Sequence, residues 1–153
     1  MVMKVVNSIV NRDLTNRKER DELMRHVESG ITGDGLFLIL RVMSMVFSLN
    51  RNFNKNIRNF DGRYIFNSSD GSFAVSIVFG NSKMSVYKKK IENPDVTITF
   101  KNAKALKNLA LSPKPDIFQS VINQDISVNG NLNYLYRFAS MLNELQLIVK
   151  RKI

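Results

Sequence analysis

Apolar and polar residues alternate with period two in five short runs between residues 63 and 129, which is the spacing of half-buried β-strands. The runs are Tyr64–Asn67, Phe73–Phe79, Met84–Val86, Val96–Phe100 and Ile126–Asn129. Asp70-Gly71 and Gly80–Ser82 supply turn residues between the first three runs. We therefore predict five strands, the first three forming a meander, with one apolar face common to all five.

Helical periodicity precedes these strands. The stretch 16–30 begins with a capping box at Asn16 and Glu19 and is strongly polar, with only a narrow apolar stripe. The stretch 35–50, with Asp34 as a candidate cap, is apolar on nearly every side. Such a helix is expected to be sandwiched between other elements.

Three further helices are expected among the later strands. Residues 102–111 and 114–123 have the pattern of short helices, and residues 132–149 have the pattern of a long one. The order of elements predicts one α+β domain, in which a five-stranded, mostly antiparallel sheet has helices covering one face.

The last predicted helix has more apolar surface than one packing face requires. Its apolar residues fill an arc of roughly 180° at about 100° per residue, whereas a helix that only covers a sheet needs little more than about 100°. The arc consists of Tyr134, Leu135, Phe138, Ala139, Met141, Leu142, Leu145, Ile148 and Val149. The surplus indicates contact with another helix such as 35–50, with a partner subunit, or with a cavity.

The composition is that of an ordinary globular domain of 153 residues, 44% hydrophobic and 24% charged. Cysteine is absent, which excludes disulfides and thiolate chemistry and fits a reducing cytoplasm. The most apolar window, 35–50, contains Arg41 and is shorter than the ~20 residues that cross a bilayer. The first residues lack the apolar core of a signal peptide. We expect a soluble, cytoplasmic protein.

The net charge of +10, from 23 basic and 13 acidic residues, is spread along the chain. Such a charge attracts nucleic acid, an anionic membrane surface or an anionic small ligand. The densest basic groups, Lys88–Lys90 and Lys150–Lys152, have the pattern of solvated strand ends and of a tail. Charge alone therefore leaves the partner open.

The sequence offers little for catalysis or metal binding. Its single histidine, His26, falls on the charged 16–30 helix, where an exposed side chain is expected. No carboxylate pair has the spacing of a shared acid/base site, and no His, Asp and Glu cluster has metal-ligand spacing. Gly33–Gly35 lacks the strand–loop–helix context of a phosphate loop. We expect no enzymatic activity, no metal and no cofactor.

A series of short motifs runs along the second half of the chain in a fixed order. These motifs are Pro94-Asp95, Val96–Phe100, Leu106–Leu111, Phe118–Asn123, Ile126–Val128 and Gly130-Asn131. Their order and spacing, from about Phe47 to Leu147, resemble the sterol carrier protein 2 domain family. The chain departs from the family at Gln124, where a glycine is common. Residues 1–34 have no clear counterpart, so we expect an N-terminal helical extension at 1–34 and a sterol carrier protein-like domain at 35–153.

The resemblance implies that the chain binds fatty acids, acyl-CoA esters, sterols or other lipids in an apolar tunnel between sheet and helices. Carried over by position, the lining would comprise Phe73, Val75, Ile77, Ile98, Phe100, Phe118, Val121, Ile122, Phe138, Met141, Leu142 and Leu145. Asn123 lies where many members carry a polar glutamine and would orient a ligand head group. Each apolar residue of this set also fits a plain hydrophobic core.

Three functions follow as hypotheses. The first is non-catalytic carriage of a lipid or fatty-acyl ligand by reversible partition, with transient contact with an anionic membrane surface. The second is a ligand-free module whose last helix mediates oligomerisation. The third, nucleic-acid binding, requires aromatic residues on an exposed sheet face, whereas here they share a face with Val and Ile. Lipid co-purification, a ligand-free dimer or salt-sensitive RNA binding would distinguish the three.

Overall fold

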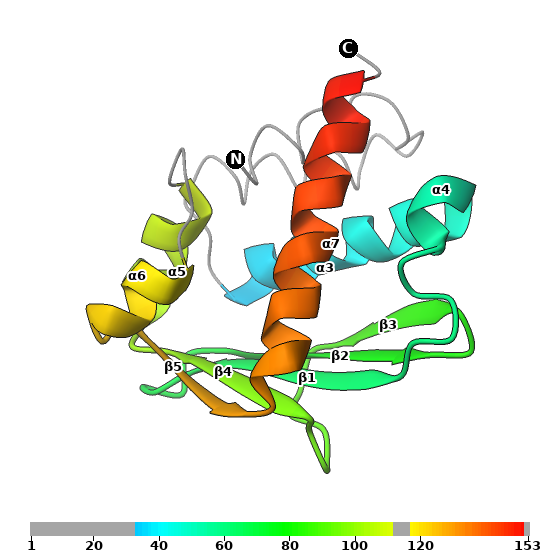
Figure 1. The fold of residues 1–153 in the computed structure, drawn as a ribbon. Coiled ribbons are helices and arrows are strands. Elements are labelled where there is room, and N and C mark those ends of the chain that lie inside the picture. The colour runs from blue at the N-terminus through cyan, green and yellow to red at the C-terminus, as the bar shows by residue number, and fades with distance from the viewer. Residues whose placement is uncertain (1–32, 112–116, 152–153) are drawn as a thin grey trace.

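The computed structural model describes residues 33–111 and 117–151, so the predicted 16–30 helix and His26 lie outside the described residues. Within those ranges the chain forms a five-stranded sheet and five helices. The predicted fold class is confirmed, because the domain is α+β with a mostly antiparallel sheet. Figure 1 shows that the labelled helices all lie on one side of the sheet.

The sheet has the strand order β3-β2-β1-β4-β5. The strands are β1 (Gly62–Ser68), β2 (Ala74–Gly80), β3 (Lys83–Tyr87), β4 (Val96–Phe100) and β5 (Ile126–Gly130). The first three form the predicted antiparallel meander. β4 then returns to pair in parallel with β1, and β5 pairs antiparallel with β4. The connection between β3 and β4 therefore crosses from one edge of the meander to the other, and this places β1 at the centre of the sheet.

Strand register places the apolar side chains on one face. Tyr64 of β1 is opposite Ile77 of β2 and Val96 of β4. Two residues further along β1, Phe66 is opposite Val75 and Ile98. Because side chains two residues apart lie on the same side of a strand, these rows form the continuous apolar face that the alternation predicts.

Phe73 lies one residue before β2, although the sequence pattern placed it in the second strand. Its N–H donates to Ser68 Oγ at 3.1 Å, and its carbonyl accepts from the Ser68 N–H at 3.2 Å. These bonds close the turn that contains Asp70 and Gly71. The Phe73 side chain is nevertheless buried with the sheet residues. The structure therefore differs from the prediction in where β2 begins, and Phe73 still lies on the predicted apolar face.

The helices are α3 (Gly33–Leu49), α4 (Arg51–Asn54), α5 (Ala103–Leu111), α6 (Ile117–Ile122) and α7 (Leu132–Arg151). Four of them correspond to predicted helices. The pattern did not indicate α4, a single turn capped by the Asn50 side chain, which accepts a hydrogen bond from the Phe53 N–H. The Asn131 side chain likewise accepts from the Asn133 N–H at the start of α7. Short polar caps of this kind favour helix initiation.

Helix α3 packs on β2 and β3. It begins at Gly33, so Asp34 lies in its first turn and does not precede the helix as predicted. Ser44 Oγ donates to the Met84 carbonyl of β3 at 2.6 Å, which satisfies an acceptor in this edge strand. Several apolar residues of α3 remain half-buried, namely Leu36, Phe37, Leu38, Ile39 and Met45. Among the described residues, α3 is thus packed on the side that faces β2 and β3, which is one of the two sides that the sequence predicted to be covered.

The lysine-rich loop after β3 crosses the other face of the sheet. Ser76 Oγ, which is buried, donates to the Lys89 carbonyl, and the Arg63 guanidinium donates to the Glu92 carbonyl. The side chains of Lys88–Lys90 are exposed. Lys88 Nζ lies 2.6 Å from Asp34 Oδ1. The position of this basic group agrees with the interpretation of solvated charge near a strand end.

Candidate functional site

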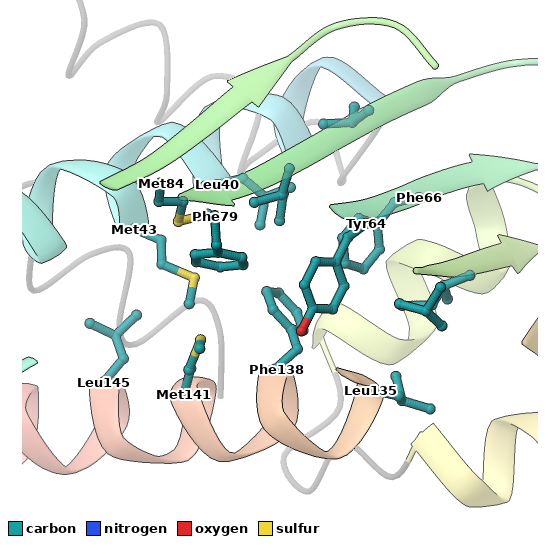
Figure 2. Close-up of a cluster of buried hydrophobic side chains, with 14 of the residues drawn as sticks. Leu40, Met43, Tyr64, Phe66, Phe79, Met84, Leu135, Phe138, Met141 and Leu145 are labelled. Carbon is teal, nitrogen blue, oxygen red and sulfur yellow. The ribbon is translucent and has the colours of Figure 1, made fainter. Parts of the chain in front are cut away.

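One continuous cluster of buried apolar side chains lies between the sheet and helices α3 and α7. Figure 2 shows side chains of β1, β2 and β3 pointing toward α7, and those of α7 pointing back. Its labelled members are Leu40, Met43, Tyr64, Phe66, Phe79, Met84, Leu135, Phe138, Met141 and Leu145. In the same view Met43 of α3 points toward Met141 and Leu145. The cluster therefore joins three elements that are far apart in the sequence.

Most of the residues that the family resemblance assigned to a ligand belong to this cluster. The buried ones are Phe73, Val75, Ile77, Ile98, Phe100, Phe138, Met141 and Leu145. Leu142 packs against the cluster but is only partly buried. The sheet and α7 thus bring these nine side chains together.

The predicted residues of α6 lie elsewhere. Phe118, Val121 and Ile122 are exposed, although the sequence interpretation had them forming one wall of the tunnel. Helix α6 is only six residues long and directs Ile117 toward the cluster. The stripe at i, i+3 and i+4 formed by the other three therefore lies on a different side of the helix. In this structure these side chains face away from the cluster.

Asn123 and Gln124 form the end of α6. Asn123 is exposed, and its side-chain oxygen accepts a hydrogen bond from Gln119 Nε2 at 3.0 Å. Gln124 has a φ of +65°, its N–H donates to the Val121 carbonyl, and the Asp125 N–H donates to the Ser120 carbonyl. This bonding pattern is a Schellman motif, whose left-handed position usually holds glycine. Gln124 therefore adopts the left-handed turn conformation without a glycine.

Tyr64 supplies the polar group of the described cluster. It is fully buried, its hydroxyl donates to the Tyr134 carbonyl of α7 at 2.7 Å, and the Phe138 ring centroid lies 5.6 Å from its own. Burial raises the pKa of the Tyr64 phenol above its ordinary value, because the charged form would lose its hydration. Tyr64 is therefore neutral near pH 7 and acts as a hydrogen-bond donor that ties β1 to α7.

The structure adds residues to the cluster that were not among the predicted lining. Phe79, Met84 and Leu135 belong to it, and the alternation and the helical arc had already placed them on apolar faces. Met43 belongs to it as well. Its helix is apolar on nearly every side, so the sequence pattern does not say which side faces the sheet.

The Pro-Asp and Gly-Asn motifs hold the framework of the cluster together. Asp95 Oδ2 accepts from the Arg63 N–H, and the Asp95 N–H donates to the Arg63 carbonyl, both at 2.8 Å. The Asp95 carbonyl also accepts from the Asn131 N–H at 2.9 Å. Gly130 has a φ of +115°, and a Cβ there would lie 2.3 Å from the Asp95 carbonyl oxygen. These contacts join β1, β4 and β5 at the point where α7 begins.

Polar contacts hold the outer side of α7. The Arg137 guanidinium donates to the Asn56 carbonyl at 2.8 Å and lies over the Phe60 ring, 4.4 Å from its centroid. The Asn56 side chain donates to Glu144 Oε2 at 2.6 Å. The loop before β1 is therefore fastened to α7 over two turns, which orients the apolar arc of the helix toward the cluster.

Across residues 33–111 and 117–151, no helix combines the length and apolarity needed to cross a membrane. The same residues contain no group of three or more His, Cys, Asp or Glu side chains that could hold a metal ion. Within the described cluster, the chemistry on offer is apolar contact together with the Tyr64 hydroxyl.

No protein-family model and no curated protein sequence matches the chain. Among solved structures, sterol carrier protein 2 from Yarrowia lipolytica in its apo form has a TM-score of 0.59 and 18% identity, covering 76% of this chain and 94% of that chain. A ubiquinone synthesis protein, UbiJ-SCP2, has a TM-score of 0.50 and 12% identity, covering 68% of this chain and 91% of that chain. Both likenesses span nearly the whole of the other chain.

The sec-alkylsulfatase Pisa1 from Pseudomonas sp. is also similar, with a TM-score of 0.51 and 15% identity. The match covers 75% of this chain but only 16% of the sulfatase chain, so it concerns a small part of that enzyme. At identities this low the comparisons speak for the fold alone. The chain has the fold of the sterol carrier protein 2 domain, in agreement with the resemblance of its sequence motifs.

Proposed function

We propose that this chain binds a hydrophobic ligand, a fatty acid, an acyl-CoA ester, a sterol or another lipid, in an apolar tunnel between its sheet and helices. Binding is reversible, and the protein carries the ligand without making or breaking a bond. The fold likeness to sterol carrier protein 2 supports this proposal. The apolar cluster between the sheet and α7 supports it independently.

The observation that carries the proposal is the partial burial of Leu142. At about 100° per residue, Leu142 lies roughly 40° from Phe138 and roughly 60° from Leu145 around α7, inside the arc that faces the cluster. Phe138 and Leu145 are buried, whereas Leu142 is only partly buried. Apolar surface is thus left over in the middle of the packing face. An acyl chain or sterol ring could cover it.

The proposed lining combines two surfaces. It consists of Phe73, Val75, Ile77, Ile98 and Phe100 on the sheet side, and Phe138, Met141, Leu142 and Leu145 on α7. Met43, Met84 and Met141 come from three different elements of the same cluster. Methionine side chains are flexible and polarisable, so they can adapt to ligands of different shape. In this proposal the exposed residues Phe118, Val121, Ile122 and Asn123 lie outside the lining.

The driving force is burial of the ligand. Transfer of apolar surface from water into the cluster contributes about 25 cal/mol per Å2. Pockets for small molecules are mostly apolar with a few polar groups that orient the ligand.

We further propose that the domain is not an enzyme. Residues 35–153 form the binding unit, and residues 1–34 form an extension. The protein works in the cytoplasm, a location that its lack of cysteine favours.

Nucleic-acid binding through base stacking on the sheet is a less favoured function. Phe66, Phe73 and Phe100 are buried beneath the helices, so they are not available to stack with nucleotide bases. Recognition by stacking requires exposed aromatic rings. Among the sheet residues, Tyr87 is the large aromatic that is exposed, and it lies on edge strand β3.

Two measurements on the full chain test lipid binding. Native mass spectrometry of the purified protein should detect a co-purifying lipid, and titration with a fluorescent fatty acid should show saturable binding that an unlabelled fatty acid, acyl-CoA or sterol displaces. A protein that carries no lipid and shows no saturable binding of any of these three classes would contradict the proposal.

A further inference from the structure

Five exposed apolar side chains gather on α6 and the first turns of α7. They are Phe118 (47% exposed), Val121 (37%), Ile122 (73%), Leu132 (50%) and Tyr136 (53%). The rings of Phe118 and Tyr136 are in contact, with centroids 5.3 Å apart. Leu132 and Tyr136 are four residues apart and so share one face of α7. We refer to these five residues as the α6–α7 patch.

The patch reverses the usual arrangement of an amphipathic helix. A helix normally buries its i, i+3, i+4 apolar stripe, yet the stripe of α6 faces solvent. None of the five side chains belongs to the buried cluster or packs against it. Contiguous exposed apolar surface of this kind marks an interaction site more often than chance.

Lysines outnumber carboxylates in the part of the chain that leads into α6. The sequence from Val96 to Asp125 contains four lysines and two carboxylates, Asp116 and Asp125. Lys101, Lys104 and Lys107 are exposed. Helix α5, which carries two of them, packs on β4, and α6 packs on the neighbouring β5. Figure 1 shows α5 and α6 next to each other on that side of the domain.

We propose that the α6–α7 patch, together with the exposed lysines of the adjacent helix α5, docks on an anionic lipid membrane surface. Apolar side chains would enter the boundary between head groups and acyl chains, while the ammonium groups contact anionic head groups. A two-fold contact between copies of the chain through this patch is less favourable, because it would bring the lysines of both copies close together. The docking does not depend on a ligand in the cluster, so it goes beyond lipid carriage.

A single tryptophan tests which face meets the membrane, since the chain has none of its own. Ile122→Trp places the reporter in the patch, and Leu49→Trp places it at another exposed apolar position, 68% exposed, at the end of α3. With phosphatidylglycerol vesicles, the emission of Ile122→Trp should shift to shorter wavelength and be quenched by brominated lipid. Leu49→Trp should show neither effect. Equal effects in both variants, or none in Ile122→Trp, would overturn the proposal.

Charge reversal tests the role of the lysines. Lys104→Glu with Lys107→Glu should lower vesicle affinity by on the order of tenfold or more, since each basic residue near the surface contributes about 1 kcal/mol. Lys89→Glu with Lys90→Glu changes the net charge equally but lies in the β3–β4 loop, and its effect should be much smaller. Equal losses would mean that net charge alone drives binding, which contradicts docking by this face.

The alternative partner for the patch is a second copy of the chain. Size-exclusion chromatography without vesicles should give the same elution for the parent and for Ile122→Ser. A parent dimer that Ile122→Ser dissociates would assign the patch to self-association and overturn membrane docking. Melting temperatures of all variants exclude unfolding, and fluorescent fatty-acid binding by Ile122→Trp separates a failure of docking from a failure of lipid carriage.

Discussion

At the residue scale, Leu142 is the position where a filled core and a ligand space lead to different results. It lies in the middle of the packing arc of α7, yet it is only partly buried. In a filled core, a larger side chain would cost about 1–3 kcal/mol through overpacking. In a ligand space, the same side chain would displace ligand and leave the fold almost unchanged.

Leu142→Trp should therefore abolish binding of a fluorescent fatty acid while the melting temperature changes by only a few degrees, given about 2–4 °C per kcal/mol for a chain of this size. Thermal melting and ligand titration are measured on the same sample. Leu49→Trp is the matched control, because Leu49 is exposed on α3, and it should keep both properties. A large melting loss in Leu142→Trp, with no binding by the parent, would indicate a plain core.

Gln124 is a residue whose backbone is strained. Its φ of +65° at the end of α6 is costly for a side chain with a Cβ and free for glycine. Gln124→Gly should raise the free energy of unfolding by about 0.5–1 kcal/mol, the relief of strain being partly offset by a more flexible unfolded chain. Gln124→Ala keeps the Cβ and should give no such gain. If both variants stabilise equally in urea denaturation, backbone strain is not the cause.

At the element scale, the corner between β5 and α7 sets where the last helix starts. Gly130 contacts the Asp95 backbone so closely that a Cβ would lie 2.3 Å from the carbonyl oxygen. Asn131 then bonds to Asp95 through its N–H and caps α7 through its side chain. Movement of this corner would shift the apolar arc of α7 relative to the sheet.

Gly130→Ala should thus lower the free energy of unfolding by about 2–4 kcal/mol, from backbone strain and a clash with neighbouring backbone. Gly71→Ala is the control, since Gly71 has a φ of +73° but a Cβ at this position would have no atom within 4 Å. It should cost only the strain, about 1 kcal/mol. Chemical denaturation of both variants measures the difference, and similar losses would show that the close approach to Asp95 is unimportant.

At the scale of the whole molecule, the sheet with α3 and α7 forms one continuous buried core among residues 33–111 and 117–151. Its buried cluster runs from Leu40 to Leu145. The polar contacts of Asn56, Arg137 and Glu144 close its outer side. Folding of this unit should therefore require little from the first thirty residues.

Deletion of residues 1–30 should leave a domain that melts cooperatively and still binds a fluorescent fatty acid. The deletion ends before α3 begins at Gly33, so it removes none of the described elements that pack on the sheet. Calorimetry and ligand titration of the shortened chain test this. Loss of a cooperative transition would mean that the N-terminal residues are part of the same folding unit and that the division at residue 34 is wrong.

Apart from the single turn α4, the helices and strands could be predicted from the sequence, because each of them has a local period. Alternation identified five strands and one apolar face, and the wide arc of the last helix identified Phe138, Met141 and Leu145 as packing residues. Residue identity also predicted the turn at Asp70 and Gly71. These features depend on neighbours along the chain, so a single sequence contains them.

Which elements meet, and which of their sides face one another, depends on contacts between parts of the chain that are distant in the sequence. The parallel pairing of β4 with β1 joins residues about thirty apart, and no local pattern specifies it. Met43 faces the cluster because α3 packs on β2 and β3, although its helix is apolar on nearly every side. The apolar stripe of helix α6 faces outward. A helix of only six residues buries too little apolar surface to fix its own orientation. Its orientation follows from β5 and α7, which only the folded chain brings beside it.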